Sequence, residues 1–123
     1  MQNIGTYFEI PVNDLERAIK FYSYVFDCDF SKDVIHGNEM AFFAFDDKGP
    51  GITGALVKGE IYKPSISGTL IYLSTSNIEE ALRKAKEKGG EVLFPKTDVP
   101  NYGSVAEFKD SEGNRTALFQ KKI

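Results

Sequence analysis

Hydrophobic and polar residues alternate over Thr6–Val12, and this alternation predicts a half-buried β-strand. Apolar residues then recur at helical spacing over Leu15–Phe26, which predicts an amphipathic helix. Asn13 is followed three residues later by Glu16, a capping-box spacing, so we expect Asn13 to cap this helix. Further apolar stretches predict strands near 28–35, 40–45 and 52–57.

The same order of elements begins again near residue 69. Thr69–Thr75 alternates like the first strand, and Ser76 with Glu79 repeats the capping-box spacing before a second apolar stripe. Gly89 and Gly90 end this helix, in the position that glycine favours. Strands are predicted near 91–95, 104–109 and 115–120. The matched caps indicate an internal repeat with an offset of about 63 residues, although chance similarity between two ordinary α+β segments is an alternative.

The repeat predicts a single α+β domain over residues 1–123, with one module at about 4–60 and a second at about 67–121. Each module has the order βαβββ. We expect the two modules to form a curved eight-stranded sheet, a cup, with both helices on its convex side. Its concave face is where a ligand pocket is expected.

Strand parity assigns side chains to the concave face. The residues that we expect there as ligand contacts are Tyr7, Glu9, Phe43, Tyr72, Glu107, Arg115 and Phe119. Three roles are open for Glu9: an ion pair with Arg115, a ligand contact, or a weak candidate for the base in catalysis. No other catalytic residue is assigned.

Several segments, in order, resemble the vicinal oxygen chelate superfamily, which holds glyoxalase I, extradiol dioxygenases, and fosfomycin and bleomycin resistance proteins. The resemblance rests on Phe8–Ala18 leading into Phe21-Tyr22, on Ile78–Ala81 followed by Lys88–Val92, and on the turn Asp110–Asn114. It covers essentially the whole chain. The Phe8-Glu9-Ile10-Pro11 sequence is most similar to the glyoxalase-like branch.

The resemblance also implies where a metal would be held. In the metal-dependent members, one ligand comes from each of the first, fourth, fifth and eighth strands. The matching positions here are Tyr7, Ala55, Leu70 and Ala117. Alanine and leucine offer no lone pair, and neutral tyrosine is a poor ligand, so we expect neither a metal nor another cofactor. A displaced site remains an alternative, in which Glu9 and Glu107 hold a hard cation.

Composition limits the classes of partner that this chain can have. Net charge is −3 and no basic run could neutralise several phosphates, so we expect no nucleic-acid partner. No stretch has the roughly 18 apolar residues of a membrane span, and the N-terminus does not resemble a signal peptide. The one cysteine, Cys28, is expected to be an inert thiol, and the one histidine, His36, to lie in an exposed loop. These observations favour a cytoplasmic protein.

Two classes of function follow. The first is a metal-free protein of the glyoxalase and bleomycin-resistance type that binds a small, partly aromatic molecule in the cup. The second is an enzyme, either a lyase or isomerase that uses Glu9 or an enzyme with a displaced metal site. We also expect a homodimer, because the inner sheet face and the strand edges need a partner and Met40–Phe45 is apolar on both faces.

Overall fold

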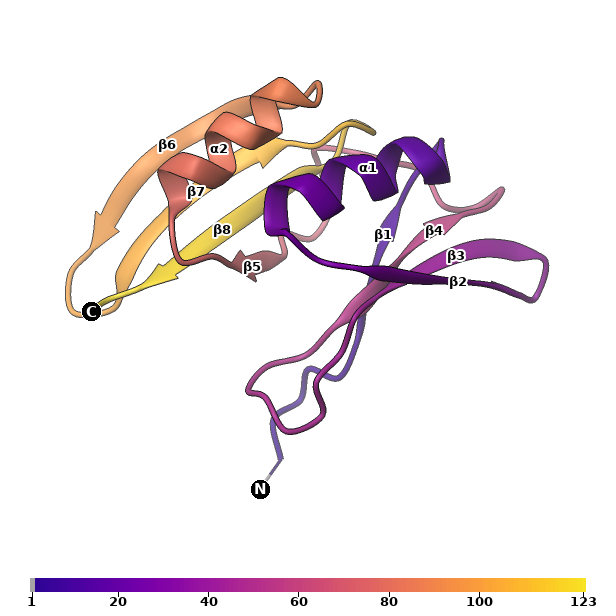
Figure 1. The fold of residues 1–123 in the computed structure, drawn as a ribbon, viewed down its shortest axis with the longest axis horizontal. Helices are drawn as coiled ribbons and strands as arrows, with labels where there is room; N and C mark the ends of the chain where they lie inside the picture. Colours follow the sequence, from indigo (N-terminus) through magenta and orange to yellow (C-terminus); the bar gives the residue numbers. More distant parts are fainter. Residues whose placement is uncertain (1) are drawn as a thin grey trace.

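Two successive βαβββ modules make up the chain (Figure 1). The structure is a computed structural model that describes residues 2–123. Its elements are β1 (Phe8–Pro11), α1 (Leu15–Phe26), β2 (Phe30–Ile35), β3 (Asn38–Phe43), β4 (Gly54–Lys58), β5 (Tyr72–Ser74), α2 (Ile78–Glu87), β6 (Glu91–Val99), β7 (Gly103–Lys109) and β8 (Arg115–Lys121). This order confirms the predicted α+β fold class.

Each module forms its own four-stranded sheet, in the orders β1-β4-β3-β2 and β5-β8-β7-β6. β1 runs parallel to β4 and β5 runs parallel to β8, so the first strand of each module lies at a sheet edge. The remaining pairs are antiparallel. Over residues 2–123, the strands of the cup therefore belong to two separate ladders, with β1 and β5 as the facing edges (Figure 1).

Both helices begin one residue later than the capping-box spacing predicts. The side chain of Asp14 accepts from the Arg17 N–H, and that of Asn77 accepts from the Glu80 N–H. Asn13 and Ser76 are therefore not the caps, although the true caps keep the offset of the repeat. Within residues 2–123, neither helix is long and apolar enough to cross a membrane.

One hydrophobic core lies between the helices and the sheets, and both modules contribute to it. The predicted helix stripe is confirmed, because Leu15, Ile78 and Leu82 are buried in this core and Ile19 packs against it. The rings of Phe21 on α1 and Phe108 on β7 lie 5.6 Å apart between centroids, so the first helix also packs on the second sheet.

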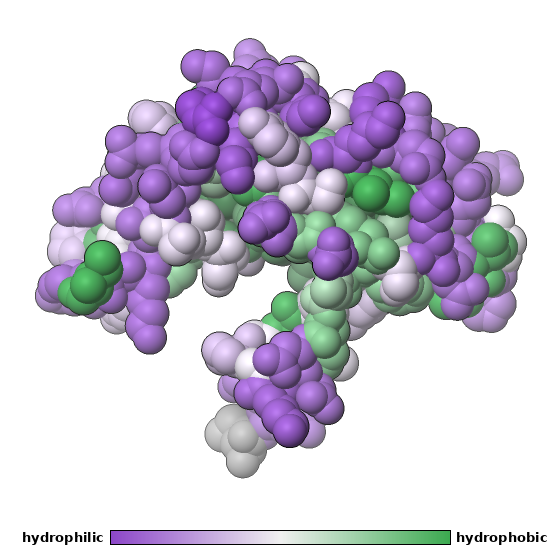
Figure 2. Space-filling model, viewed as in Figure 1, coloured by the Kyte–Doolittle hydropathy of each residue, from purple (hydrophilic) through white to green (hydrophobic). Residues whose placement is uncertain are grey.

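The predicted parity of the first and fifth strands is confirmed as well. Phe8 and Ile71 pack against the core, whereas Tyr7 and Tyr72 on the opposite parity are 44% and 53% exposed. The outer, helix-covered side is predominantly hydrophilic in Figure 2, and apolar atoms gather on the underside.

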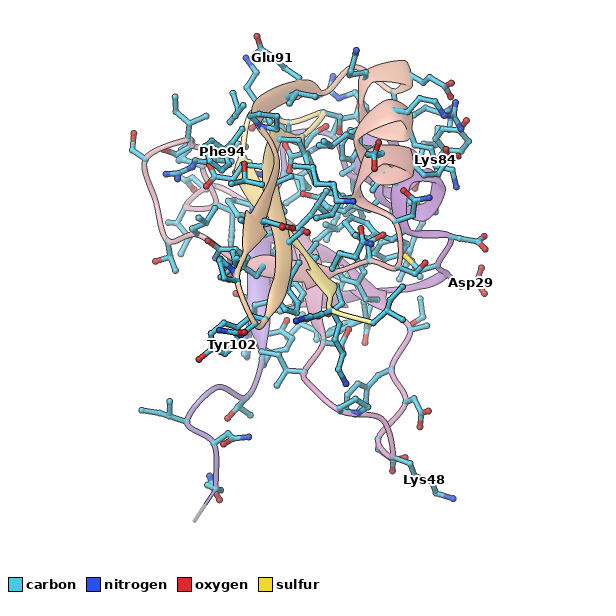
Figure 3. All side chains as sticks on the ribbon, turned by 90° about the vertical axis from the view of Figure 1, so that its left-hand side faces the viewer. Asp29, Lys48, Lys84, Glu91, Phe94 and Tyr102 are labelled. Carbon is cyan, nitrogen blue, oxygen red and sulfur yellow. The ribbon has the colours of Figure 1, made fainter. Side chains whose placement is uncertain are left out.

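Residues 44–53, between β3 and β4, leave the body as an arm (Figure 1). Lys48 marks its far end, well away from the helices (Figure 3). Within the arm, Phe45 is 61% exposed and Ile52 is 48% exposed. A hollow separates the arm from the second module (Figure 2).

Candidate ligand-binding site

Glu9 lies on the concave face of the first sheet, held by two phenols. Phe8 and Ile10 on either side of it in β1 belong to the core, which directs Glu9 to the opposite face. The Tyr7 hydroxyl donates to Glu9 Oε2 at 3.0 Å, and the Tyr62 hydroxyl donates to Glu9 Oε1 at 3.0 Å. We call Tyr7, Glu9 and Tyr62 the Tyr–Glu–Tyr cluster.

Both phenols of this cluster remain protonated at neutral pH. Burial raises the pKa of Tyr7 to about 12, and the hydrogen bond to Glu9 and the Glu9 charge act in the same direction. The hydrogen bond to Glu9 also raises the pKa of Tyr62. Because each carboxylate oxygen has two lone pairs and one phenol occupies only one of them, Glu9 is oriented and can still accept hydrogen bonds from a ligand.

Arg115 lies on the concave face of the second sheet and binds Glu107, not Glu9. Its Nε is 2.6 Å from Glu107 Oε1 and its Nη2 is 3.1 Å from Glu107 Oε2. The expected Glu9–Arg115 ion pair is therefore wrong. The physical reason is that Glu107 and Arg115 are diagonal neighbours on adjacent strands, whereas Glu9 belongs to the other sheet.

Glu9 and Arg115 nevertheless line one cavity, of about 200 Å³, between the two sheets. Glu9 and Pro11 come from β1, Lys63 and Thr69 from the segment that joins the modules, and Arg115 from the start of β8. We call it the seam cavity. It brings carboxylate, guanidinium, ammonium and hydroxyl groups together beside an apolar wall, an arrangement typical of small-molecule sites.

Two further residues expected as ligand contacts, Tyr72 and Phe119, share a face of the second sheet. Tyr72 is the register partner of Ala117, and Ser74 is the partner of Phe119. Side chains two apart on β8 point the same way, so Phe119 and Arg115 lie on one side with Tyr72. These residues form the second wall of the concave surface.

Phe43 does not belong to the concave face, contrary to the prediction. Its ring lies 4.6 Å from that of Phe30 and 5.8 Å from those of Phe8 and Tyr22, centroid to centroid, within the core under α1. Phe42 takes the concave place. Because this strand is apolar on both faces, its sequence has no alternation that could fix its parity.

The residues at the family's metal-ligand positions do not fit a metal ion. Ala55 and Ala117 are fully buried and present only methyl groups. Glu9 is bound by phenols and Glu107 by Arg115. The described residues, 2–123, contain no group of three or more His, Cys, Asp or Glu side chains that could hold a metal.

His36 and Cys28 lie outside this site. His36 is exposed in the turn between β2 and β3, with a positive φ of 52°. Burial raises the pKa of Cys28 to about 11, and the charges of Asp29 and Asp27 add to this effect. The thiol is therefore protonated at neutral pH, which does not suit a nucleophile.

A buried polar turn between β7 and β8 positions the strand that carries Glu9. Glu112 Oε1 accepts from the backbone N–H groups of Asn13 and Asp14 at 2.9 and 2.8 Å, and Glu112 Oε2 accepts from Arg17 Nε at 2.7 Å. Asn114 Nδ2 donates to the Pro11 carbonyl at the end of β1 at 2.8 Å. We call the turn Asp110–Asn114 the clamp, because it belongs to the second module and holds the first.

Sequence reasoning recognised the clamp as a turn but missed its role, and it missed Tyr62 altogether. A buried carboxylate in a polar turn leaves no periodic signal, and its partners are almost the whole chain length away. Tyr62 lies in the non-periodic segment after β4, where no parity can be assigned. Only the three-dimensional arrangement brings these groups to β1.

Comparison with known proteins agrees with this architecture. The family model of the Glyoxalase/Bleomycin resistance protein/Dioxygenase superfamily matches residues 5–118. A protein from Didymella fabae, described as a glyoxylase-like domain-containing protein, is 28% identical over 119 residues, which cover 89% of this chain and 88% of that protein.

Two solved structures share the fold. An antibiotic binding protein from Streptomyces sp. CB03234 is 25% identical, with a TM-score of 0.71 and coverage of 99% of each chain. A mutant glyoxalase I from Zea mays is 20% identical, with a TM-score of 0.67. That comparison covers 94% of this chain but 45% of the maize chain, so this chain spans about half the length of the plant enzyme.

Proposed function

This chain belongs to the Glyoxalase/Bleomycin resistance protein/Dioxygenase superfamily, and from this premise we propose that it binds a small organic molecule on its concave face without a metal. The observation that carries the proposal is the seam cavity, where Glu9 and Arg115 face a common space beside apolar residues. The similarity to an antibiotic binding protein over 99% of both chains supports a binding role. The methyl groups of Ala55 and Ala117 support the absence of a metal.

A binding role is better supported than the enzymatic alternative. Both oxygens of Glu9 already accept a phenol O–H, so this carboxylate has a fixed orientation that suits ligand recognition. Arg115 is paired with Glu107 and keeps its charge, which makes it an anchor and not an acid. The phenols beside Glu9 have raised pKa values, so they do not supply a second group that titrates near neutral pH.

The experiment is a ligand-observed NMR screen with aromatic fragments, followed by affinity measurements on two variants. Tyr72 is 53% exposed on the concave side, so Tyr72→Ala removes a ligand contact with little loss of stability. We expect Tyr72→Ala to lower the affinity for aromatic fragments roughly fivefold or more, since aromatic contacts contribute about 1 kcal/mol.

The matched control is Tyr24→Ala. Tyr24 is on α1, where its hydroxyl donates to Glu87 and its ring lies beside Lys84 of α2 and Lys88 at the end of α2, so Tyr24→Ala should leave fragment affinity unchanged. Binding that is equally strong in Tyr72→Ala, or no binding by any fragment, would contradict the proposed function.

We further propose that two copies associate through the arm. Phe45 and Ile52 project from the body with more than half and nearly half of their surfaces exposed. Beside them a surface depression of about 460 Å³ includes Tyr7 and Phe42 on the concave face. A second copy that covered this surface would bury apolar side chains and contribute to the wall of the ligand site.

A further inference from the structure

The seam cavity contains charged groups of opposite sign on opposite walls. Glu9 lies on β1 of the first sheet, and Arg115 lies on β8 of the second. Lys63, from the segment that joins the modules, adds a second positive charge to the lining. The cavity is thus neither a simple cation site nor a simple anion site.

The donors and acceptors in the cavity are only partly used within the chain. Arg115 gives Nε and one Nη2 bond to Glu107, which leaves N–H groups of the guanidinium for another acceptor. Glu9 accepts one phenol on each oxygen and retains the other lone pairs. A ligand that bridges the cavity can therefore bind both residues without displacing an existing bond.

The rest of the cavity lining favours a small ligand that has a short apolar group. Ile10, Pro11 and Ile71 form the apolar wall, and the volume is about 200 Å³. A molecule that fits this volume has a compact skeleton, so its charged ends lie close together.

We infer that the seam cavity recognises a small zwitterion, with its carboxylate at Arg115 and Lys63 and its protonated amine at Glu9. This inference rests on the proposed binding function and specifies the class of ligand. An aliphatic amino acid has this chemistry, because its two charges are separated by one carbon and its side chain is apolar. The amine and the carboxylate each gain a charge-assisted hydrogen bond, which is stronger than a neutral one.

The test uses three probes with one carbon skeleton. Leucine has both charges, leucinamide has only the positive charge, and 4-methylpentanoate has only the negative charge. Isothermal titration calorimetry should give leucine an affinity at least about tenfold higher than either analogue, since each charged hydrogen bond contributes about 1.5–3 kcal/mol.

Variants assign each end of the ligand. Glu9→Gln should reduce the affinity for leucine to that for 4-methylpentanoate, and Arg115→Gln should reduce it to that for leucinamide. Lys63→Gln is a second test of the anionic end, because Lys63 is exposed and its loss does not threaten folding. Glu79→Gln and Arg83→Gln, which change ion-paired residues of α2 on the convex side, should leave all three affinities within about twofold.

Three results would overturn the inference: equal affinities for leucine and either analogue, equal effects of the cavity and control variants, or no binding by any probe. Failure of this inference is distinguishable from failure of the proposed function. If none of the three probes binds but aromatic fragments bind in a Tyr72-dependent way, the binding function stands and only the zwitterion assignment falls.

Discussion

The hydroxyl of Tyr22 is fully buried, and it donates to Asp110 Oδ2 at 2.6 Å. Tyr22→Phe removes this donor while the ring keeps its packing against Phe26 and Phe43. We expect the free energy of unfolding, measured by urea denaturation, to fall by about 1–2 kcal/mol, since a buried acceptor loses a partner. Tyr24→Phe removes a surface hydroxyl and should change the free energy of unfolding by less than about 0.5 kcal/mol. Equal effects would contradict this account.

A second prediction at this scale concerns the protonation of Tyr7. Burial, the hydrogen bond to Glu9 and the Glu9 charge raise its pKa to about 12 from an ordinary 10.0. Glu9→Gln removes the charge but not the burial, so the pKa should fall and still remain above 10.0. NMR titration of ring-labelled tyrosine would measure it, and Tyr7→Phe would identify the signal. An unchanged pKa in Glu9→Gln would mean that Glu9 is not the partner.

Residues differ in how far sequence alone determines their place. Tyr7 and Glu9 lie in a segment with clear alternation, so their face could be predicted. Phe43 lies in a strand with no alternation, so the same reasoning failed there. The partner of Arg115 could not be predicted, because the choice between Glu9 and Glu107 depends on which strands are neighbours.

Among the elements, the clamp and α1 form the most informative pair. The side chain of Glu112 is fully buried, whereas that of Arg17 is 53% exposed. Burial alone would raise the pKa of Glu112. The hydrogen bonds from Arg17, the backbone of Asp14, Ser111 and the backbone of Asn13 outweigh this effect and hold the pKa below its ordinary value.

Glu112→Gln keeps the shape of the side chain and removes its charge. We expect the free energy of unfolding to fall by about 2 kcal/mol at neutral pH, since buried charged hydrogen bonds are weakened. A carboxyl with a lowered folded-state pKa stabilises the fold fully above its unfolded-state pKa, and this stabilisation is lost as pH falls through the folded-state value.

The difference between wild type and Glu112→Gln should therefore be constant between about pH 6 and 8 and shrink below about pH 4. Urea denaturation across this range measures it. Glu16→Gln, which changes an exposed residue of α1, is the control, and its free energy of unfolding should differ from that of wild type by less than about 0.5 kcal/mol. A difference that persists at low pH would show that the charge is not its cause.

The identity and order of the elements were predictable, but the helix starts were not. Apolar periodicity predicted all eight strands and both helices. The internal repeat supports each prediction, because every element of the first module has a counterpart in the second. The caps were displaced by one residue, since Asn13 and Asp14 can both cap in isolation. Glu112 binds the Asn13 N–H, and that long-range contact has no signature in the local sequence.

At the scale of the whole molecule, association through the arm predicts the mass of the protein in solution. Sedimentation at micromolar concentration should give about twice the 13.7 kDa of one chain. Phe45→Lys places a charge on the exposed apolar part of the arm and should shift the species toward the monomer. Asp47→Lys, at the polar tip, introduces a lysine without removing apolar surface and should remain dimeric. A monomeric wild type would exclude the proposed association.

The clamp also has a consequence for how the chain is synthesised. Arg17 and Glu112 are 95 positions apart, so the ribosome completes α1 long before the carboxylate that binds Arg17 and the backbone N–H groups of Asn13 and Asp14 exists. The first module therefore gains its full set of contacts only after the turn between β7 and β8 has been made. Such long-range closure slows folding. A nascent chain stalled before residue 112 should therefore remain sensitive to protease, however long it is held.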